Sequence, residues 1–387
     1  MGFQSQIREA LSDLERAGLL RKPLRISGPQ GPEIEIAGRR VLCFCSNNYL
    51  GLANHPALAE ASQAAVRTDG VGAAASRLIT GTMDAHQDAE LACADFLGAP
   101  AVALFSTGYA ANVGTLQALV GPGDAIFSDA LNHASLIDGC RLSRAEVHVY
   151  SHRDVDHLDS LLRQHRSRAR RALIVTDALF SMDGVRAPLP DIGKLARSFD
   201  TGLLVDEAHS LGVLGPKGRG LSALHNVEAD VVVGTLGKAF GVAGAFIAAS
   251  KEIVSFIQNR ARSFVYSTAP PPMLARAAVA ALELAREADD ARATLLAYAS
   301  ELRSELRALG FDVPEGDTQI VPVLIGENHR TMELSAKLLD RGIFVQGIRP
   351  PTVPDGTARL RLTPMATHRP EHIQRAIGAF ASLVRNP

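Results

Sequence analysis

The sequence has few of the features that mark several large protein classes. Its 387 residues contain four cysteines, at Cys43, Cys45, Cys93 and Cys140. A disulfide framework needs more cysteines, and a zinc site built on the Cys-x-Cys pair needs a second pair at matching spacing. We therefore expect reduced, mostly buried thiols, no metal site and a cytoplasmic protein.

Long apolar runs and excess charge are also missing. No stretch of about 18 apolar residues runs without charge, so we expect no membrane span. The segment MGFQSQIREALSDLERAG is charged and amphipathic, unlike a signal peptide. The formal net charge of −1 gives no reason to expect nucleic acid or an acidic membrane surface as a partner. The arginine-rich run at 163–171 is typical of a solvated helix end.

Several catalytic motifs are absent or incomplete. DEAH at 206–209 matches the Walker B motif of a helicase family, but no G-x-x-x-x-G-K-[ST] loop precedes it. GVGAAA at 70–75 resembles a dinucleotide-binding fingerprint, but a helical pattern precedes it where a strand is required. H-E-x-x-H and G-x-S-x-G do not occur, which argues against a zinc protease and an α/β-hydrolase.

The pattern of apolar residues divides the chain into three parts. Residues 1–45 predict an amphipathic helix reaching about Leu24, followed by a small β-hairpin. Residues 46–275 predict a large α/β domain, because short apolar runs alternate with helical stretches, as in parallel strands covered on both faces. The runs are AVALFST, DAIFSD, VHVYS, ALIVTD, GLLVDEAH, DVVVGTL and AFIAAS. Residues 276–387 predict a smaller α+β domain that ends in a helix.

Three of these predicted strands are followed by polar side chains. They are Ser181 after ALIVTD, Asp206 and His209 in GLLVDEAH, and Thr235 and Lys238 in VVVGTLGK. Ligands bind beyond the carboxyl ends of the strands in open parallel sheets, so these groups would share one crevice if the strands are neighbours. Each residue alone could instead be a helix cap or a satisfied buried polar group.

A candidate phosphate site lies earlier in the chain. LFSTGYAANVGTLQAL combines a strand, a Ser-Thr-Gly turn and a helix that begins near Tyr109. The N-terminus of such a helix offers free N–H groups and the positive end of a dipole, although Ser, Thr and Gly are also ordinary caps. With Lys238 and Asp206, these are the parts needed to hold pyridoxal 5′-phosphate.

The side-chain types suit that cofactor. Lys238 would form an imine with the aldehyde, which needs a neutral amine, and apolar surroundings lower the pKa of a lysine. Asp206 would keep the pyridine nitrogen protonated, and His209 could reach the ring hydroxyl. His133, in NHASLIDG, could stack on the ring or simply cap a helix.

Long motifs in a fixed order resemble those of the α-oxoamine synthases, a branch of the fold-type I pyridoxal phosphate enzymes. They are SNNYLGL, SRLITGT, GYAAN, SDALNHASLIDGCRLS, FSMDG, VDEAHSLGVLG, GRG, GTLGKAFG and RPPTVPDGTARLRL. The resemblance implies a large domain with a mostly parallel seven-stranded sheet and a smaller α+β C-terminal domain. It also implies a homodimer with shared active sites that condenses an amino acid with an acyl thioester and releases carbon dioxide.

The resemblance also implies roles for single residues. The catalytic residues would be Lys238, His133 and Asp206. Further cofactor contacts would come from Gly108, Tyr109, Ser181, His209 and Thr235, and from Ser267 and Thr268 of the other subunit. Arg361, assisted by Asn47, would bind the substrate carboxylate through its guanidinium fork. Arg21 and Thr352 fall at further substrate-binding positions.

The resemblance favours one pair of substrates over two alternatives. RPPTVPDGTARLRL and SRLITG favour L-alanine and a pimeloyl thioester of coenzyme A or acyl carrier protein, the pair used in biotin biosynthesis. SDALNHASLIDGCRLS and GTLGKA are closer to enzymes that use glycine and acetyl-CoA. A different acyl donor is a third alternative. From other classes, the alternatives are an ATPase built around DEAH and a Schiff-base aldolase without a cofactor.

Overall fold

The computed structural model describes residues 2–385 and divides the chain into two compact units. The large unit comprises Leu52–Ser181 and Val185–Arg292. The small unit comprises Met1–Gly51, Met182–Gly184 and Ala293–Pro387. The three-part division at residues 46 and 276 stays a prediction.

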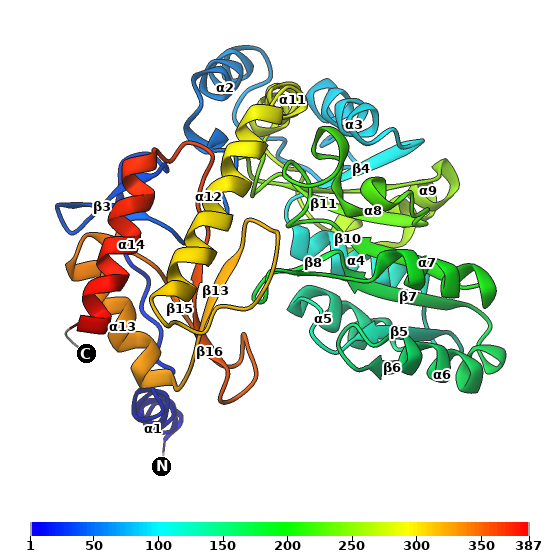
Figure 1. Ribbon diagram of the computed structural model, residues 1–387. Coiled ribbons are helices and arrows are strands. Elements are labelled where there is room, and N and C mark those ends of the chain that lie inside the picture. Colours follow the sequence, from blue (N-terminus) through cyan, green and yellow to red (C-terminus); the bar gives the residue numbers. More distant parts are fainter. Residues whose placement is uncertain (1, 386–387) are drawn as a thin grey trace. The chain divides into compact units, whose positions relative to one another are not determined.

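A seven-stranded sheet organises the large unit (Figure 1). Its order is β4-β12-β11-β10-β7-β5-β6. The strands are β4 (Ala101–Phe105), β5 (Ala125–Asp129), β6 (Glu146–Tyr150), β7 (Ala172–Asp177), β10 (Gly202–Asp206), β11 (Val231–Thr235) and β12 (Ala245–Ala249). All seven coincide with the apolar runs of the sequence. Strand β12 runs antiparallel to both of its neighbours, β4 and β11, and the other six strands run in one direction, so the prediction of a mostly parallel sheet is confirmed.

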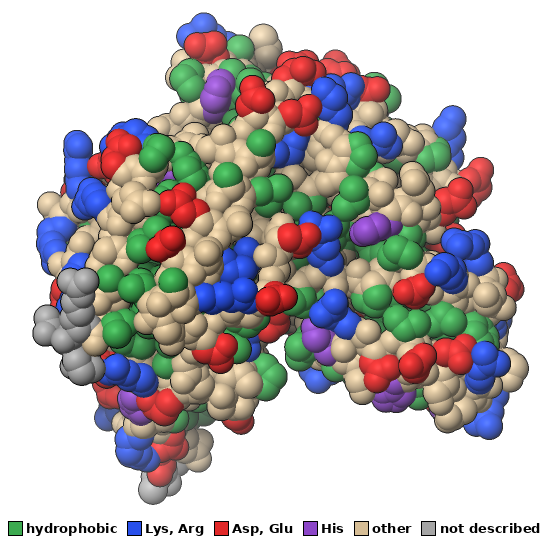
Figure 2. Space-filling view, in the orientation of Figure 1, with side chains coloured by type: hydrophobic (Ala, Val, Ile, Leu, Met, Phe, Trp, Pro, Cys, Tyr) green, Lys and Arg blue, Asp and Glu red, His purple; other side chains and the backbone are tan. Residues whose placement is uncertain are grey.

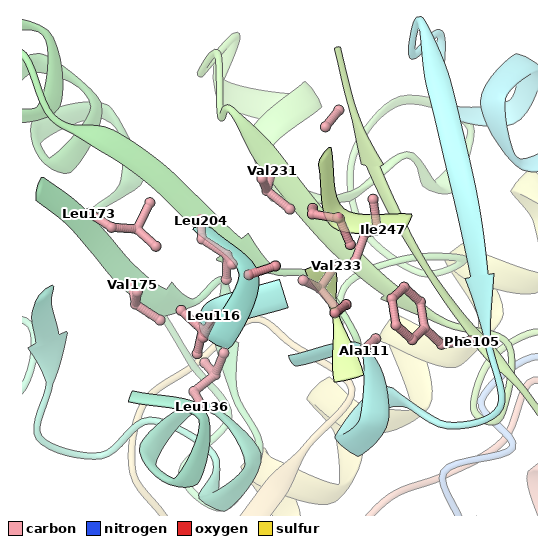
Figure 3. Close-up of a cluster of buried hydrophobic side chains, with 14 of the residues drawn as sticks. Phe105, Ala111, Leu116, Leu136, Leu173, Val175, Leu204, Val231, Val233 and Ile247 are labelled. Carbon is pink, nitrogen blue, oxygen red and sulfur yellow. The ribbon is translucent and has the colours of Figure 1, made fainter. Parts of the chain in front are cut away.

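The core of the large unit forms where helices pack on this sheet. The helices on one face are α4 (Gly108–Leu119), α5 (Ala134–Ser143), α9 (Lys251–Arg260) and α10 (Arg262–Val265). In Figure 3, Leu116 and Leu136 from two of these helices lie among the strand side chains Val175 and Leu204. Every residue of β5, β7 and β12 is buried, as expected of strands covered on both faces.

Further elements complete the large unit. The other helices are α2 (Pro56–Thr68), α3 (Asp84–Leu97), α6 (Val155–His165), α7 (Leu189–Ser198), α8 (Gly220–His225) and α11 (Pro272–Arg286), and β8 (Leu179–Phe180) pairs with β9 (Val185–Arg186). The α11 helix packs against α2 and α3, while α6 packs against β5 and β6.

The small unit contains the predicted hairpin. Strands β2 (Glu33–Ile36) and β3 (Arg39–Cys43) pair antiparallel around Ala37 and Gly38, whose φ values of 50° and 77° suit a tight hairpin turn. The hairpin sheet also includes β1 (Ile26–Ser27) and β14 (Ile343–Phe344), and the second sheet has β13 (Val321–Gly326), β15 (Gly347–Ile348) and β16 (Ala358–Leu362). Its helices are α13 (Asn328–Asp340), α14 (Pro370–Arg385) and most of α12 (Asp289–Ala308).

The N-terminal helix is shorter than the sequence predicted. Helix α1 spans Phe3–Arg16 and stops well before Leu24. Gly18 has a φ of 66°, and the N–H groups of Leu19 and Leu20 both donate to the Leu14 carbonyl. This left-handed glycine ends the helix, although the apolar spacing continues to Leu19.

The composition is reflected in the structure. Cys43, Cys93 and Cys140 are buried free thiols, and Cys45 is a partly buried one. Within residues 2–385, no helix combines the length and the hydropathy that a membrane crossing needs. Acidic and basic side chains are interspersed on the face shown in Figure 2.

Candidate active site

Three adjacent strands bring the predicted polar side chains together. Strands β7, β10 and β11 are neighbours, and Asp206 pairs in register with Asp177 on one side and Val233 on the other. Asp206 and Thr235 are the last residues of their strands, and Lys238 follows in the loop after β11. The expectation that these strands are neighbours is therefore correct.

A pocket of about 190 Å³ lies at the carboxyl ends of these strands, within the large unit. The predicted residues that line it are Gly108, Tyr109, His133, Asp206, His209, Thr235 and Lys238. It is also lined by residues that the sequence did not single out, namely Asn112, Ser135, Asp177, Ala208, Val233 and Gly234.

Two donors orient the Asp206 carboxylate. This residue is 5% exposed, and its Oδ2 accepts a hydrogen bond from Asn112 Nδ2 at 2.7 Å. Its Oδ1 accepts from the Ala208 N–H at 2.9 Å. Asn112 is 1% exposed and also donates to Ser135 Oγ at 2.9 Å. Because a carboxylate offers about four acceptor positions, these two bonds leave capacity for a donor on a ligand.

His133 caps α5 through its ring. Its Nδ1 accepts from the Ser135 N–H at 3.3 Å and lies 2.7 Å from Ser135 Oγ. The pKa of His133 is lowered, mainly by desolvation of the ring. The charge of Asp206 raises this pKa, and the charge of Lys238 lowers it. Since Nδ1 accepts a main-chain hydrogen bond, the proton of the neutral ring sits on Nε2.

Asp177 is a second carboxyl group beside Asp206. It is buried at the end of β7, and its Oδ2 accepts from the His133 N–H at 2.7 Å. Burial raises the pKa of Asp177 well above its usual range, and the charge of Asp206 adds to this shift. Asp177 therefore favours its neutral form.

The N-terminus of α4 contributes main-chain donors to the pocket. Thr107 caps this helix, because its Oγ1 accepts from the Ala110 N–H at 3.1 Å. The N–H groups of Gly108 and Tyr109 come too early in the helix to find an intrahelical acceptor, so they suit an anion. A Cβ added at Gly108 would approach nothing more closely than Thr235 Cβ, at 4.0 Å, so there is room beside these donors.

These residues fit pyridoxal phosphate. An amine on Lys238, a buried carboxylate on Asp206 and an anion-binding helix terminus line one pocket. The Oδ1 of Asn112 is buried and has no hydrogen-bond partner within residues 2–385. The pocket therefore combines the groups that this cofactor needs with a polar atom that the protein itself leaves unsatisfied.

Three predicted cofactor contacts are not among the described residues that line this pocket. Ser181 directly follows β8. Ser267 is partly buried, and Thr268 is exposed and forms an isolated antiparallel bridge with Ser76. Their predicted roles stay predictions.

The predicted substrate-binding residues lie in the small unit and form two pairs. Arg361 is buried on β16, and its Nη1 donates to Asn47 Oδ1 at 3.1 Å. Arg21 Nη2 and the Thr352 N–H both donate to the Arg349 carbonyl, at 3.3 and 3.2 Å. The structure therefore brings Arg361 next to Asn47, and Arg21 next to Thr352.

Comparison with known proteins shows the family. The family model described as aminotransferase class I and II matches residues 39–380. The chain belongs to this family. This agrees with the α-oxoamine synthase resemblance and with the fold class predicted from the sequence, and both predictions are confirmed.

Several known proteins are similar to this chain over nearly its whole length. An 8-amino-7-oxononanoate synthase from Citrifermentans bemidjiense is 50% identical over 374 residues, which is 96% of each chain. One from Geobacter sulfurreducens is 49% identical over 377 residues, again 96% of each chain. A solved serine palmitoyltransferase variant from S. paucimobilis, with a bound PLP–myriocin aldimine, is 31% identical, with a TM-score of 0.94 and 100% and 99% of the two chains covered.

Two of the pocket residues that the sequence analysis did not single out carry a signal in the sequence. Asp177 ends the strand ALIVTD, which is the same signal that singled out Asp206. Asn112 ends the motif GYAAN, four residues after Gly108, and this spacing puts the two residues on one side of a helix.

Proposed function

We propose that the chain is an 8-amino-7-oxononanoate synthase, which joins L-alanine to a pimeloyl thioester with release of carbon dioxide, in biotin biosynthesis. The observation that carries this proposal is the pocket shared by Lys238 and Asp206, in a chain 50% identical to a curated synthase over 96% of its length. This identity favours L-alanine and a pimeloyl thioester over glycine and acetyl-CoA.

The cofactor is pyridoxal phosphate. When bound, it supplies an aldehyde that combines with amines and a ring that withdraws electrons from the α-carbon of the amino acid. Lys238 would hold it covalently, and the N–H groups of Gly108 and Tyr109 would bind its phosphate. Asp206, oriented by Asn112, would hold the proton of its ring nitrogen.

Further cofactor contacts are proposed at His209, Thr235 and Ser181. His209 and Thr235 line the pocket. The Oγ1 of Thr235 accepts from the Gly237 N–H at 3.1 Å and donates to the Gly244 carbonyl at 3.2 Å, which fixes its rotamer at the end of β11.

Two side chains of the pocket move protons in this proposal. The Nζ of Lys238, once free of the cofactor, takes the α-proton of L-alanine as a general base and later returns a proton to the product. His133 is neutral and carries its proton on Nε2, because Nδ1 accepts from the Ser135 N–H. This Nε2–H donates to the thioester carbonyl oxygen as negative charge develops on it.

Arginine side chains of the small unit recognise the substrates. Arg361 would bind the carboxylate of L-alanine, since a guanidinium fork engages a carboxylate bidentately. Its orientation is set by Asn47 Oδ1 and by the Tyr49 hydroxyl, which accepts from Arg361 Nη2 at 3.2 Å. Arg21 and Thr352 are proposed as further substrate contacts.

We also propose a homodimer with shared active sites, working in the cytoplasm. Ser267 and Thr268 are not among the described residues that line the pocket of their own chain, and Thr268 is exposed next to Tyr266, which is 72% exposed. These observations support a contact of Ser267 and Thr268 with the cofactor phosphate of a second subunit.

Lys238→Ala tests the proposal, with Lys217→Ala as the matched control on an exposed lysine. Protein supplied with pyridoxal phosphate is reduced with borohydride and its peptides are mapped by mass. We expect modification at Lys238, and turnover lost only in Lys238→Ala. An unmodified Lys238 peptide would contradict the cofactor assignment. Faster thiol release from acetyl-CoA with glycine than from a pimeloyl thioester with L-alanine would contradict the substrate assignment.

A further inference from the structure

Three metal-ligating side chains gather at the edge of the large sheet, among residues that the proposed reaction does not use. Glu146 and His148 lie two residues apart on the edge strand β6, so they face the same side of the sheet. His165 is the last residue of α6, which packs beside β6 (Figure 1). One potential ligand atom from each of the three lies within 4.8 Å of the other two.

His148 is a partly buried member of this cluster. Its side chain is 10% exposed, and its Nε2 lies 3.3 Å from Glu146 Oε1. That Nε2 is buried and makes no hydrogen bond with any residue from 2 to 385. The ring stacks on His165 with a centroid distance of 3.9 Å and on Phe127 of β5 at 5.2 Å. A buried nitrogen without a hydrogen bond is costly, so a ligand on this Nε2 would be favourable.

The ring of His148 favours its neutral form. Burial lowers the pKa of His148, the charge of His165 lowers it further, and Glu146 raises it. A neutral imidazole is the form that binds metals. Of the two arginines beside His165 in the chain, Arg163 forms an ion pair with Asp159, and Arg166 donates to the carbonyls of Phe199 and Asp200.

We propose that Glu146, His148 and His165 bind one Zn²⁺ ion or a similar divalent transition metal. Two imidazole nitrogens and one carboxylate oxygen form a known zinc ligand set, with water in the fourth position. Tetrahedral bonds of about 2.0–2.1 Å place ligand atoms roughly 3.3 Å apart. Because the atoms here lie within 4.8 Å of one another, rotamer adjustments of up to about 1.5 Å close the cluster. The bound ion ties the end of α6 to the edge strand and stabilises the large unit by RT ln(1 + [Zn²⁺]/Kd).

Equilibrium dialysis of the holoenzyme against micromolar Zn²⁺ tests this site, with the metal counted per chain and the melting midpoint measured in parallel. The parent protein and His157→Asn, which changes a partly buried histidine near the other end of the same helix, are expected to bind one equivalent and to melt at a higher temperature with Zn²⁺. His165→Ala is expected to lose this equivalent, and Glu146→Gln to weaken it at least about tenfold.

A turnover assay distinguishes failure of this metal site from failure of the proposed reaction. Thiol release is expected to be the same in the parent protein and in the three variants. The comparison of variants also corrects for Zn²⁺ held by free thiols. The proposal is wrong if the parent protein binds no more Zn²⁺ than His165→Ala, or if Glu146→Gln binds Zn²⁺ as tightly as the parent.

Discussion

Replacing Asn112 with alanine removes the side chain that fixes one oxygen of the Asp206 carboxylate. Asn112 Nδ2 donates to Asp206 Oδ2 at 2.7 Å and to Ser135 Oγ at 2.9 Å, and all three residues are buried. In Asn112→Ala, the Ala208 N–H still holds Oδ1, so the carboxylate can turn about this remaining bond. The proposed contact of Asp206 with the ring nitrogen then loses its orientation.

The size of the effect follows from the type of hydrogen bond. A hydrogen bond to an ionised group is worth about 1.5–3 kcal/mol, and about 1.4 kcal/mol corresponds to a tenfold change. If the whole loss falls on the transition state, kcat/KM for L-alanine and a pimeloyl thioester should decrease about 10- to 150-fold. Thiol release measures this rate, and the visible absorbance of the cofactor reports its loading.

Asn259→Ala is the matched control. Asn259 is an exposed asparagine whose Nδ2 donates to the Ser255 carbonyl of its own helix at 2.8 Å. We expect its kcat/KM to stay within about twofold of the parent, because exposed substitutions away from a site have small effects. If fully loaded Asn112→Ala is as active as Asn259→Ala, the carboxylate does not need this donor and the reasoning fails.

Three further substitutions probe stability. Burial lowers the pKa of His368 to about 4, whereas the pKa of a histidine in the unfolded chain is about 6.5. Between pH 6.5 and 4, the unfolded chain therefore binds a proton at this residue that the folded chain does not bind. The free energy of unfolding should therefore fall by about 3 kcal/mol between pH 6.5 and 4 because of this group. The melting midpoint of His368→Asn should depend less on pH than that of the parent protein. An equal pH dependence in the two proteins would contradict this. Gly234→Ala places a Cβ 2.3 Å from Phe246 Cζ and should destabilise by about 1–3 kcal/mol in urea unfolding. Gly378→Ala in α14 meets nothing within 4 Å and should stabilise by about 0.5–1 kcal/mol, so the reverse order of these two variants would refute the packing argument.

The strands and the centre of the pocket could be predicted from the sequence because a buried strand is a short run of apolar residues. A run such as ALIVTD is apolar on both faces, and this happens when helices cover both sides of a sheet. The rule that ligands bind at the carboxyl ends of strands then selected Asp206 and Lys238. Both residues line the pocket.

Other features depend on contacts that no local pattern records. The direction of β12 is one, because AFIAAS is equally apolar whether its strand is parallel or antiparallel. The Glu146, His148 and His165 cluster is another, because its members come from a strand and a helix end at no motif spacing. The early end of α1 follows from a single backbone angle at Gly18, which outweighs the apolar spacing after it.

The main chain, rather than another titratable side chain, selects the tautomer of His133. An amide N–H keeps its proton across the whole working range of an enzyme, so the imidazole it pairs with presents the same N–H at neutral and at alkaline pH. Alkalinity cannot switch off this donor. A decline of turnover on the alkaline side would therefore have to be traced to a different ionisation.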